Sequence, residues 1–271
     1  SDEIAWDAFC FMNRVMLLQR NIMSFSKKHA VNKDCNLGDF VDPRRPENDF
    51  GWRPFQIAFI LMNLNGIVNP QHEDREVVDL LYFPTGGGKT EAYLGLMAFV
   101  IANRRLRASE NDEYNRDGGV TAILRYTLRL LTTQQRDRIT KMVIAAEMVR
   151  EKTAPKYGTE PISIGFWVGG GVTPNNFEEL KDSPDNPGEG ARKRRLIYRQ
   201  LLACPFCGTE LDENNFEIDH DRKSVSIYCS DPNCIFHKYR GRKAIPVYLV
   251  DEEIYARCPT IILSTVDKFA R

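Results

Sequence analysis

The sequence predicts an α/β domain with a mostly parallel sheet covered by helices, and three observations support this fold class. Strand-like apolar stretches alternate with helix-like segments along the chain. A triple-glycine turn joins one strand to the helix after it, and two short cysteine pairs interrupt the alternation. The expected strands are residues 78–83, 120–131, 162–168 and 260–264, and the helices between them are residues 89–106 and 133–150.

Composition sets broad limits on the function. The 271 residues contain 37 Lys+Arg and 37 Asp+Glu, so the net charge does not argue for a polyanionic partner, and a nucleic-acid surface would have to be a local patch. The chain has neither a signal peptide nor an apolar run of about 18 residues, so we expect a cytoplasmic protein without membrane contact. In that compartment, clustered cysteines indicate metal before disulfide.

The chain divides into four expected regions. Residues 1–50 hold an N-terminal helix, expected at residues 4–28, and a linker. Residues 51–174 form the first part of the α/β core, and residues 175–243 form an insert with the cysteine pairs. Residues 244–271 continue the core. Because the first residue is Ser1 and the last segment reads as continuing, we expect the chain to be a piece of a larger protein.

The triple-glycine turn is the strongest motif. Glycines let backbone N–H groups converge on a phosphate, and the following helix N-terminus adds a positive dipole. Lys89 then reaches the β- and γ-phosphates, and the Thr90 hydroxyl holds Mg²⁺. The pattern departs from the usual one because Phe83 replaces its first glycine. The alternative is a structural turn with a solvated lysine. The residues expected to bind ATP at this turn are Thr85, Gly86, Gly87, Gly88, Lys89 and Thr90.

Gln56 is a candidate for reading the adenine base. It follows Pro54, which suits a first helical turn, and it precedes the glycine turn along the chain. A carboxamide carries both a donor and an acceptor, so it can pair with an adenine edge. The alternative is an ordinary surface glutamine at a helix start.

Three corners after predicted strands are candidates for a nucleic-acid backbone. Hydroxyls, amides and helix N-termini suit phosphate contacts, and the carboxyl ends of parallel strands gather at one edge of a sheet. The alternatives are solvent-exposed arginines and plain tight turns. The candidate residues are Arg129, Thr132 and Gln134 at the first corner, Gly169 and Gly170 at the second, and Thr265 at the third.

The insert carries a predicted zinc site. Cys204 and Cys207 form one short pair, and Cys229 and Cys234 form the other, in the arrangement of a zinc ribbon. Four thiolates leave no open position, so the zinc would be structural. Two disulfides are the alternative, and His237 is a spare ligand or a surface histidine. The basic run 192–195, within the charge-rich stretch 175–200, is expected on a solvated face or in a mobile loop, with phosphate binding as the minority interpretation.

The order of these motifs resembles the first RecA-like domain of superfamily 2 helicases. Residues 53–56 resemble the adenine-reading Q motif, residues 84–90 resemble motif I, and residues 129–134 match the spacing of motif Ia. Gly169-Gly170 resembles motif Ib, and Ser264-Thr265 resembles motif Ic. The resemblance implies a RecA-like P-loop domain of an ATP-dependent helicase or translocase, a hydrolase that grips the nucleic-acid backbone at the last three motifs.

A narrower resemblance is to the large helicase subunit of DISARM bacterial phage-defence systems. It is carried by four strings, at residues 5–10, 126–135, 166–170 and 264–271, and by the Cys-Pro-x-Cys-Gly zinc insert. This resemblance implies action on single- or double-stranded DNA, an antiviral role, a partner subunit, and a second RecA-like domain in the rest of the chain.

The acidic pair of motif II is missing from these residues. Asp251-Glu252-Glu253 precedes Thr265, which is the wrong order for motif II, so we interpret it as a solvated turn. Phosphoryl transfer needs that pair, so we expect this fragment to bind nucleotide weakly and to hydrolyse little. The alternatives are a nucleic-acid-binding scaffold with a structural zinc and a non-hydrolysing P-loop, and a P-loop signalling ATPase without a nucleic-acid partner.

Overall fold

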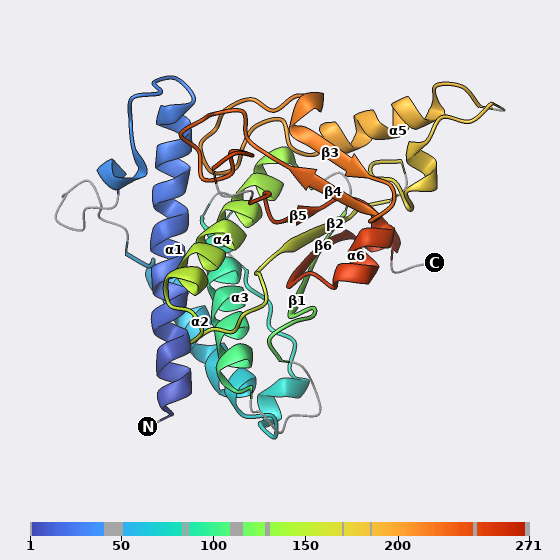
Figure 1. Ribbon diagram of the computed structural model, residues 1–271. Helices are drawn as coiled ribbons and strands as arrows, with labels where there is room; N and C mark the ends of the chain where they lie inside the picture. Colours follow the sequence, from blue (N-terminus) through green and yellow to red (C-terminus); the bar gives the residue numbers. More distant parts are fainter. Residues whose placement is uncertain are drawn as a thin grey trace.

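The computed structural model describes residues 2–40, 51–82, 84, 87–108, 116–127, 131–169, 171–184, 186–240 and 243–268. It is a mixed α/β structure with a four-stranded parallel sheet flanked by helices, which confirms the predicted fold class (Figure 1). The α-helices are α1 (Glu3–His29), α2 (Pro54–Val68), α3 (Lys89–Leu106), α4 (Thr133–Lys152), α5 (Glu189–Tyr198) and α6 (Asp251–Arg257). The strands are β1 (Ala122–Tyr126), β2 (Ile164–Trp167), β3 (Phe216–Asp219), β4 (Ser224–Ile227), β5 (Val247–Tyr248) and β6 (Ile261–Thr265).

The sheet has the order β1-β6-β2-β5, and every neighbouring pair is parallel. Strands β2, β5 and β6 are short and mainly apolar, and most of their residues are buried. Such a composition is typical of parallel strands that are covered on both faces. Gly165 of β2 faces α6, where a Cβ would meet Ile254 at 2.9 Å. Phe166 alternates to the opposite face, which α3 and α4 cover (Figure 1).

Helix α1 runs along the outside of α3 and α4 and packs against both (Figure 1). Asp2 caps its first turn by accepting the Ala5 amide at 3.0 Å, and lysines occupy its last turn. Its inner face places Phe11, Met12 and Val15 in the core. The predicted N-terminal helix is confirmed, with its bounds one residue wider at each end.

The insert between β2 and β5 contains α5, the antiparallel hairpin β3–β4 and the cysteine knuckles. The mobile-loop alternative for the basic run 192–195 does not hold, because the run lies on α5, where Arg192 and Arg195 are exposed on a solvated face. Long-range ion pairs hold this helix: Lys193 pairs with Glu179 at 2.6 Å, and Arg194 pairs with Asp182 at 3.0 Å. The run also pairs locally, because Arg192 Nε donates to Glu189 at 2.7 Å.

Two further expectations are wrong. Residues 78–82 are not a strand: Val78, Leu80 and Tyr82 are 93%, 88% and 91% exposed, because no strand of the described sheet pairs with them. Phe83 lies outside the described residues. The acidic segment starting at Asp251 is not a solvated turn but the first turn of α6. Asp251 is buried in an ion pair with Lys268, and burial raises its pKa.

Candidate nucleotide and metal sites

The glycine turn leads directly into α3, as the motif requires. Gly88 is the residue before the helix and adopts φ 92°, a left-handed conformation that favours glycine. Lys89 and Thr90 form the first helical turn, and Lys89 Nζ lies 3.5 Å from the Pro84 carbonyl oxygen. The N-terminus of this 18-residue helix supplies positive dipole at the turn. Thr85 and Gly86 lie outside the described residues, so their contacts stay predictions.

Gln56 and Arg53 tie the start of α2 to this turn. Gln56 Nε2 donates to the Gly88 carbonyl at 2.7 Å, and Arg53 donates to the Gly87 carbonyl at 2.7 Å. The Gln56 Oε1 atom accepts the Arg53 amide at 2.8 Å, and the side chain is only 5% exposed. Gln56 is therefore not an ordinary surface residue, and both ends of its carboxamide hold the turn in place. Adenine reading by Gln56 stays a prediction.

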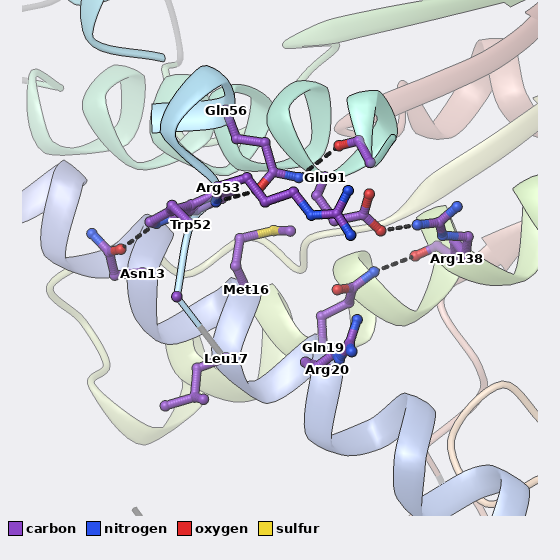
Figure 2. Close-up of a pocket in the computed structure, with 12 residues that line it drawn as sticks. Asn13, Met16, Leu17, Gln19, Arg20, Trp52, Arg53, Gln56, Glu91 and Arg138 are labelled. Atoms are coloured by element: carbon purple, nitrogen blue, oxygen red, sulfur yellow. Dashed lines mark hydrogen bonds and ion pairs between the residues drawn. The ribbon is translucent and has the colours of Figure 1, made fainter. Parts of the chain in front are cut away.

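A cavity of about 440 Å³ adjoins the turn, within the usual size range of small-molecule sites (Figure 2). Helix α1 forms one wall, and residues 51–53, Gln56, Gly88, Glu91 and Arg138 form the others. Glu91 pairs with Arg138, and Trp52 Nε1 donates to Asn13 Oδ1 at 2.8 Å. The lining residues are Asn13, Met16, Leu17, Gln19, Arg20, Gly51, Trp52, Arg53, Gln56, Gly88, Glu91 and Arg138.

The wall that α1 contributes was not predicted from the sequence. The contacts join residues far apart in the chain: Gln19 Nε2 donates to the Arg138 carbonyl at 3.3 Å across 119 positions. The spacing of residues within a short stretch of sequence cannot predict a contact of this range. The polar residues on an otherwise buried helix face, Asn13 and Gln19, are the one signal that could have indicated it.

The predicted nucleic-acid corners lie at one edge of the sheet, as the parallel topology requires. Tyr126 of β1 is in register with Thr265 of β6, and Trp167 of β2 with Ser264, so these three strands end together. Among the described residues other than its chain neighbours, nothing lies within 4 Å of a Cβ built on Gly169. Arg129 and Gly170 lie outside the described residues.

The hydroxyl and amide groups at these corners differ in exposure. Gln134 is exposed at the start of α4. Thr132 is also exposed, but its hydroxyl caps α4 by accepting the Gln135 amide at 3.3 Å. Thr265 is only 1% exposed, so its side chain faces the protein interior. The nucleic-acid roles of all three stay predictions.

The four cysteines Cys204, Cys207, Cys229 and Cys234 come together as buried free thiols. Cys204 Sγ lies 3.8 Å from Cys234 Sγ, and Cys207 Sγ lies 3.5 Å from Cys229 Sγ. A zinc–sulfur bond of about 2.3 Å gives a tetrahedron with an edge of about 3.8 Å, so these distances fit a tetrahedral zinc and not two disulfides. The backbone amides of Asp231 and Phe236 donate to Cys229 and Cys234 at 3.4 and 3.5 Å.

The pKa values of the four thiols are shifted in opposite directions. Hydrogen bonds with the neighbouring thiols, that of Cys204 first, lower the pKa of Cys207, whereas burial raises the pKa of Cys204. A divalent cation at the centre would favour four thiolates. His237 is not part of this cluster, and its ring instead lies edge-on to Tyr239 at 5.7 Å between centroids.

Two further residues beside the cysteines, His29 and Asp231, were not predicted from the sequence. His29 Nε2 lies 2.8 Å from Asp231 Oδ2, and both side chains are buried. Together with Cys207 they form a second cluster of metal-type ligands. No spacing in the sequence connects residues 202 positions apart.

None of the helices in the described ranges combines the length and the hydropathy that crossing a bilayer requires.

Comparison with known proteins gives one relative. No protein-family model matches the chain. The chain is 48% identical over 273 aligned residues to DISARM protein DrmA of Bacillus paralicheniformis. The match covers 98% of this chain and 23% of that protein, so the chain spans about a quarter of the relative's length. The similarity to a DISARM protein that the sequence strings indicated is thereby confirmed.

Proposed function

Starting from this similarity to DISARM protein DrmA, we propose that the chain is part of the motor of an ATP-dependent superfamily 2 DNA helicase or translocase in antiviral defence. One observation carries the proposal. The glycine turn at the N-terminus of α3 is fixed by Arg53 and Gln56 and opens beside a cavity of about 440 Å³. Fixed donors, a helix dipole and an adjoining cavity are what a nucleoside triphosphate needs.

Each residue at the turn has a proposed role. The Lys89 ammonium contacts the β- and γ-phosphates of ATP, and the Thr90 hydroxyl holds Mg²⁺. The backbone of residues 85–88 cradles the phosphates, and Gln56 reads the base. The exposed corner residues Thr132 and Gln134 and the half-buried Gly169 lie near the DNA backbone, and the four cysteines hold a structural zinc ion. The remaining chain and a defence partner supply the rest of the motor.

Replacing Lys89 tests this proposal. The Lys89→Ala variant removes a charge-assisted contact worth about 1.5–3 kcal/mol, so we expect roughly 10- to 100-fold weaker binding of a fluorescent ATP analogue with Mg²⁺. Lys152→Ala, at the exposed far end of α4, is the matched control and should bind as the wild type does. Equal affinities of Lys89→Ala and Lys152→Ala would contradict the proposal.

Hydrolysis gives a second measurement. We expect the 271 residues to release little phosphate from ATP in steady state, because no acidic pair stands in the motif II position. Turnover that is lost in Lys89→Ala would show that this expectation is wrong.

The scaffold alternative makes a different prediction. It requires salt-sensitive DNA binding that survives Lys89→Ala and is lost on zinc chelation. The ion pairs of Arg192, Lys193 and Arg194 with nearby carboxylates leave less charge for phosphates on α5, which favours the motor. DNA affinity of Lys89→Ala, measured with and without a chelator over a range of salt concentrations, distinguishes the two.

A further inference from the structure

The C-terminal end of α1 docks directly on the first cysteine knuckle. Gly208 adopts φ 76°, and a Cβ there would meet the Ser26 carbonyl oxygen at 2.2 Å. Only glycine permits this approach of the two backbones. Phe25 of α1 packs edge-on against Phe206 of the knuckle, with 5.4 Å between ring centroids. The knuckle is therefore an intramolecular docking surface for α1.

A polar network continues from α1 to the sulfur atoms. His29 Nε2 contacts the Asp231 carboxylate at 2.8 Å, and the Asp231 amide donates to Cys229 Sγ at 3.4 Å. On the other side, the Thr209 hydroxyl donates to the same carboxylate at 3.3 Å and lies 3.2 Å from Cys207 Sγ. One sulfur atom is thus contacted by Asp231, the partner of His29, and a second by Thr209, which bonds to Asp231.

The charges around the cysteine cluster also favour the docking of α1 beside it. A zinc ion with four thiolates carries a net charge of about −2, and Asp231 adds a further negative charge beside it. The Lys33 ammonium, in the turn after α1, donates to Thr209 Oγ1 at 2.7 Å and lies 3.5 Å from Asp231 Oδ2. The segment that follows α1 therefore brings a cation to the side of the cluster where negative charge gathers.

The other half of α1 forms a wall of the cavity. Asn13 accepts the Trp52 indole N–H at 2.8 Å, and Gln19 donates to the Arg138 carbonyl at 3.3 Å (Figure 2). One rigid helix of 27 residues thus contacts the cysteine cluster at one end and the cavity along its middle.

We propose that the cysteine centre is a clasp: zinc binding fixes His29 and the end of α1, and α1 then holds the cavity wall in place. The clasp couples zinc occupancy to the shape of the cavity through a contact between His29 and Asp231. This proposal does not depend on which ligand the cavity binds. Coupling of this kind is reciprocal, so loss of the α1 contact must weaken zinc binding, and loss of zinc must loosen α1.

The first test measures zinc affinity of the 271-residue chain by competition with a chromogenic chelator. Outer contacts of metal ligands typically contribute 10- to 100-fold to affinity, so we expect His29→Ala to bind zinc at least about tenfold more weakly than the wild type. His29→Gln, which keeps a donor, should recover part of the loss. His72→Ala is the matched control, because His72 pairs with Asp74 in the short helix Glu73–Glu76. A zinc affinity of His29→Ala within twofold of the wild type overturns the proposal.

The second test follows α1 when zinc is removed from the otherwise unchanged chain. Of the three tryptophans, Trp52 bonds to α1, so the double variant Trp6→Phe, Trp167→Phe leaves one probe at the cavity wall. We expect chelation to shift Trp52 emission to the red and to increase amide exchange in residues 13–29, while β6 stays protected. Increased exchange in residues 204–234 alone, with unchanged Trp52 emission, overturns the proposal. If chelation unfolds the whole chain, the His29→Ala affinity decides.

Discussion

Replacing Gly88 tests whether Gln56 and the glycine turn form one rigid unit. Gly88 and Gly188 both precede a helix in the left-handed conformation, at φ 92° and φ 85°. A Cβ on Gly88 would meet Gln56 Nε2 at 2.7 Å, whereas among the described atoms nothing lies within 4 Å of a Cβ on Gly188. Gly188→Ala is therefore a matched control that carries the backbone strain without the collision.

The expected free energies of unfolding follow from these contacts. An alanine in the left-handed region costs about 1–2 kcal/mol, partly offset by about 0.4–1 kcal/mol from a less flexible unfolded chain. Gly188→Ala should therefore lose about 1 kcal/mol. Gly88→Ala also displaces the bond from Gln56 to the Gly88 carbonyl and leaves a buried amide without its partner, which adds about 1–3 kcal/mol. The total for Gly88→Ala is about 2–4 kcal/mol.

Urea unfolding of the wild type and both variants measures the difference. A double-mutant cycle then assigns the difference to Gln56, because the excess cost of Gly88→Ala should disappear in a Gln56→Ala background. Equal losses for Gly88→Ala and Gly188→Ala, or an excess that persists without Gln56, would refute a turn held by the glutamine.

Two further predictions concern buried carboxylates. Burial raises the pKa of Glu253 from 4.5 to about 7, so its unfolded form ionises first and the wild type loses stability as the pH rises from 4.5 to 7. Glu253→Gln should therefore be more stable by about 2–3 kcal/mol at pH 8 and equal to the wild type below pH 4.5, as measured by urea unfolding. A gain that is the same at every pH would contradict this cause. Glu147 accepts two bonds of 2.7 Å from buried Arg150, so Glu147→Ala should cost about 3–5 kcal/mol in the same assay. Asp7, whose side chain is 39% exposed and pairs with Lys156, is the control, and Asp7→Ala should lose less than about 1 kcal/mol. Similar losses of unfolding free energy for the two variants would show that the ion pair of Glu147 with Arg150 contributes no more stability than a surface pair.

The helices of the core could be predicted because their signals are local. Helix α3 begins and ends where the sequence indicated, since Lys89 follows a glycine turn and Arg107 follows a long apolar run. The strand predicted at residues 120–131 corresponds to β1, which ends at Tyr126. Its apolar run continues beyond the residues that pair with β6, and an apolar pattern alone does not mark where pairing stops.

The errors share a physical cause. Residues 78–82 have the composition of a strand, but a strand exists only where a neighbour accepts its hydrogen bonds. Helix α5 was not predicted as a helix, because the carboxylates that hold Lys193 and Arg194 lie 12–14 positions away in the chain. The contact of His29 with Asp231 spans 202 positions, so no window of sequence contains it. The cysteine cluster was predictable because each ligand pair is local.

The length of that last contact determines the order in which α1 acquires its partners during synthesis. Ribosomes add about 5–20 residues per second, so Asp231 emerges roughly 10–40 s after His29. The helices α3 and α4 that cover Phe11 and Val15 emerge earlier. Because closing so long a loop costs entropy that only the later contacts offset, we expect the first half of α1 to dock before its last turn meets Asp231. The contact between the last turn of α1 and Asp231 thus forms late in the synthesis of these residues.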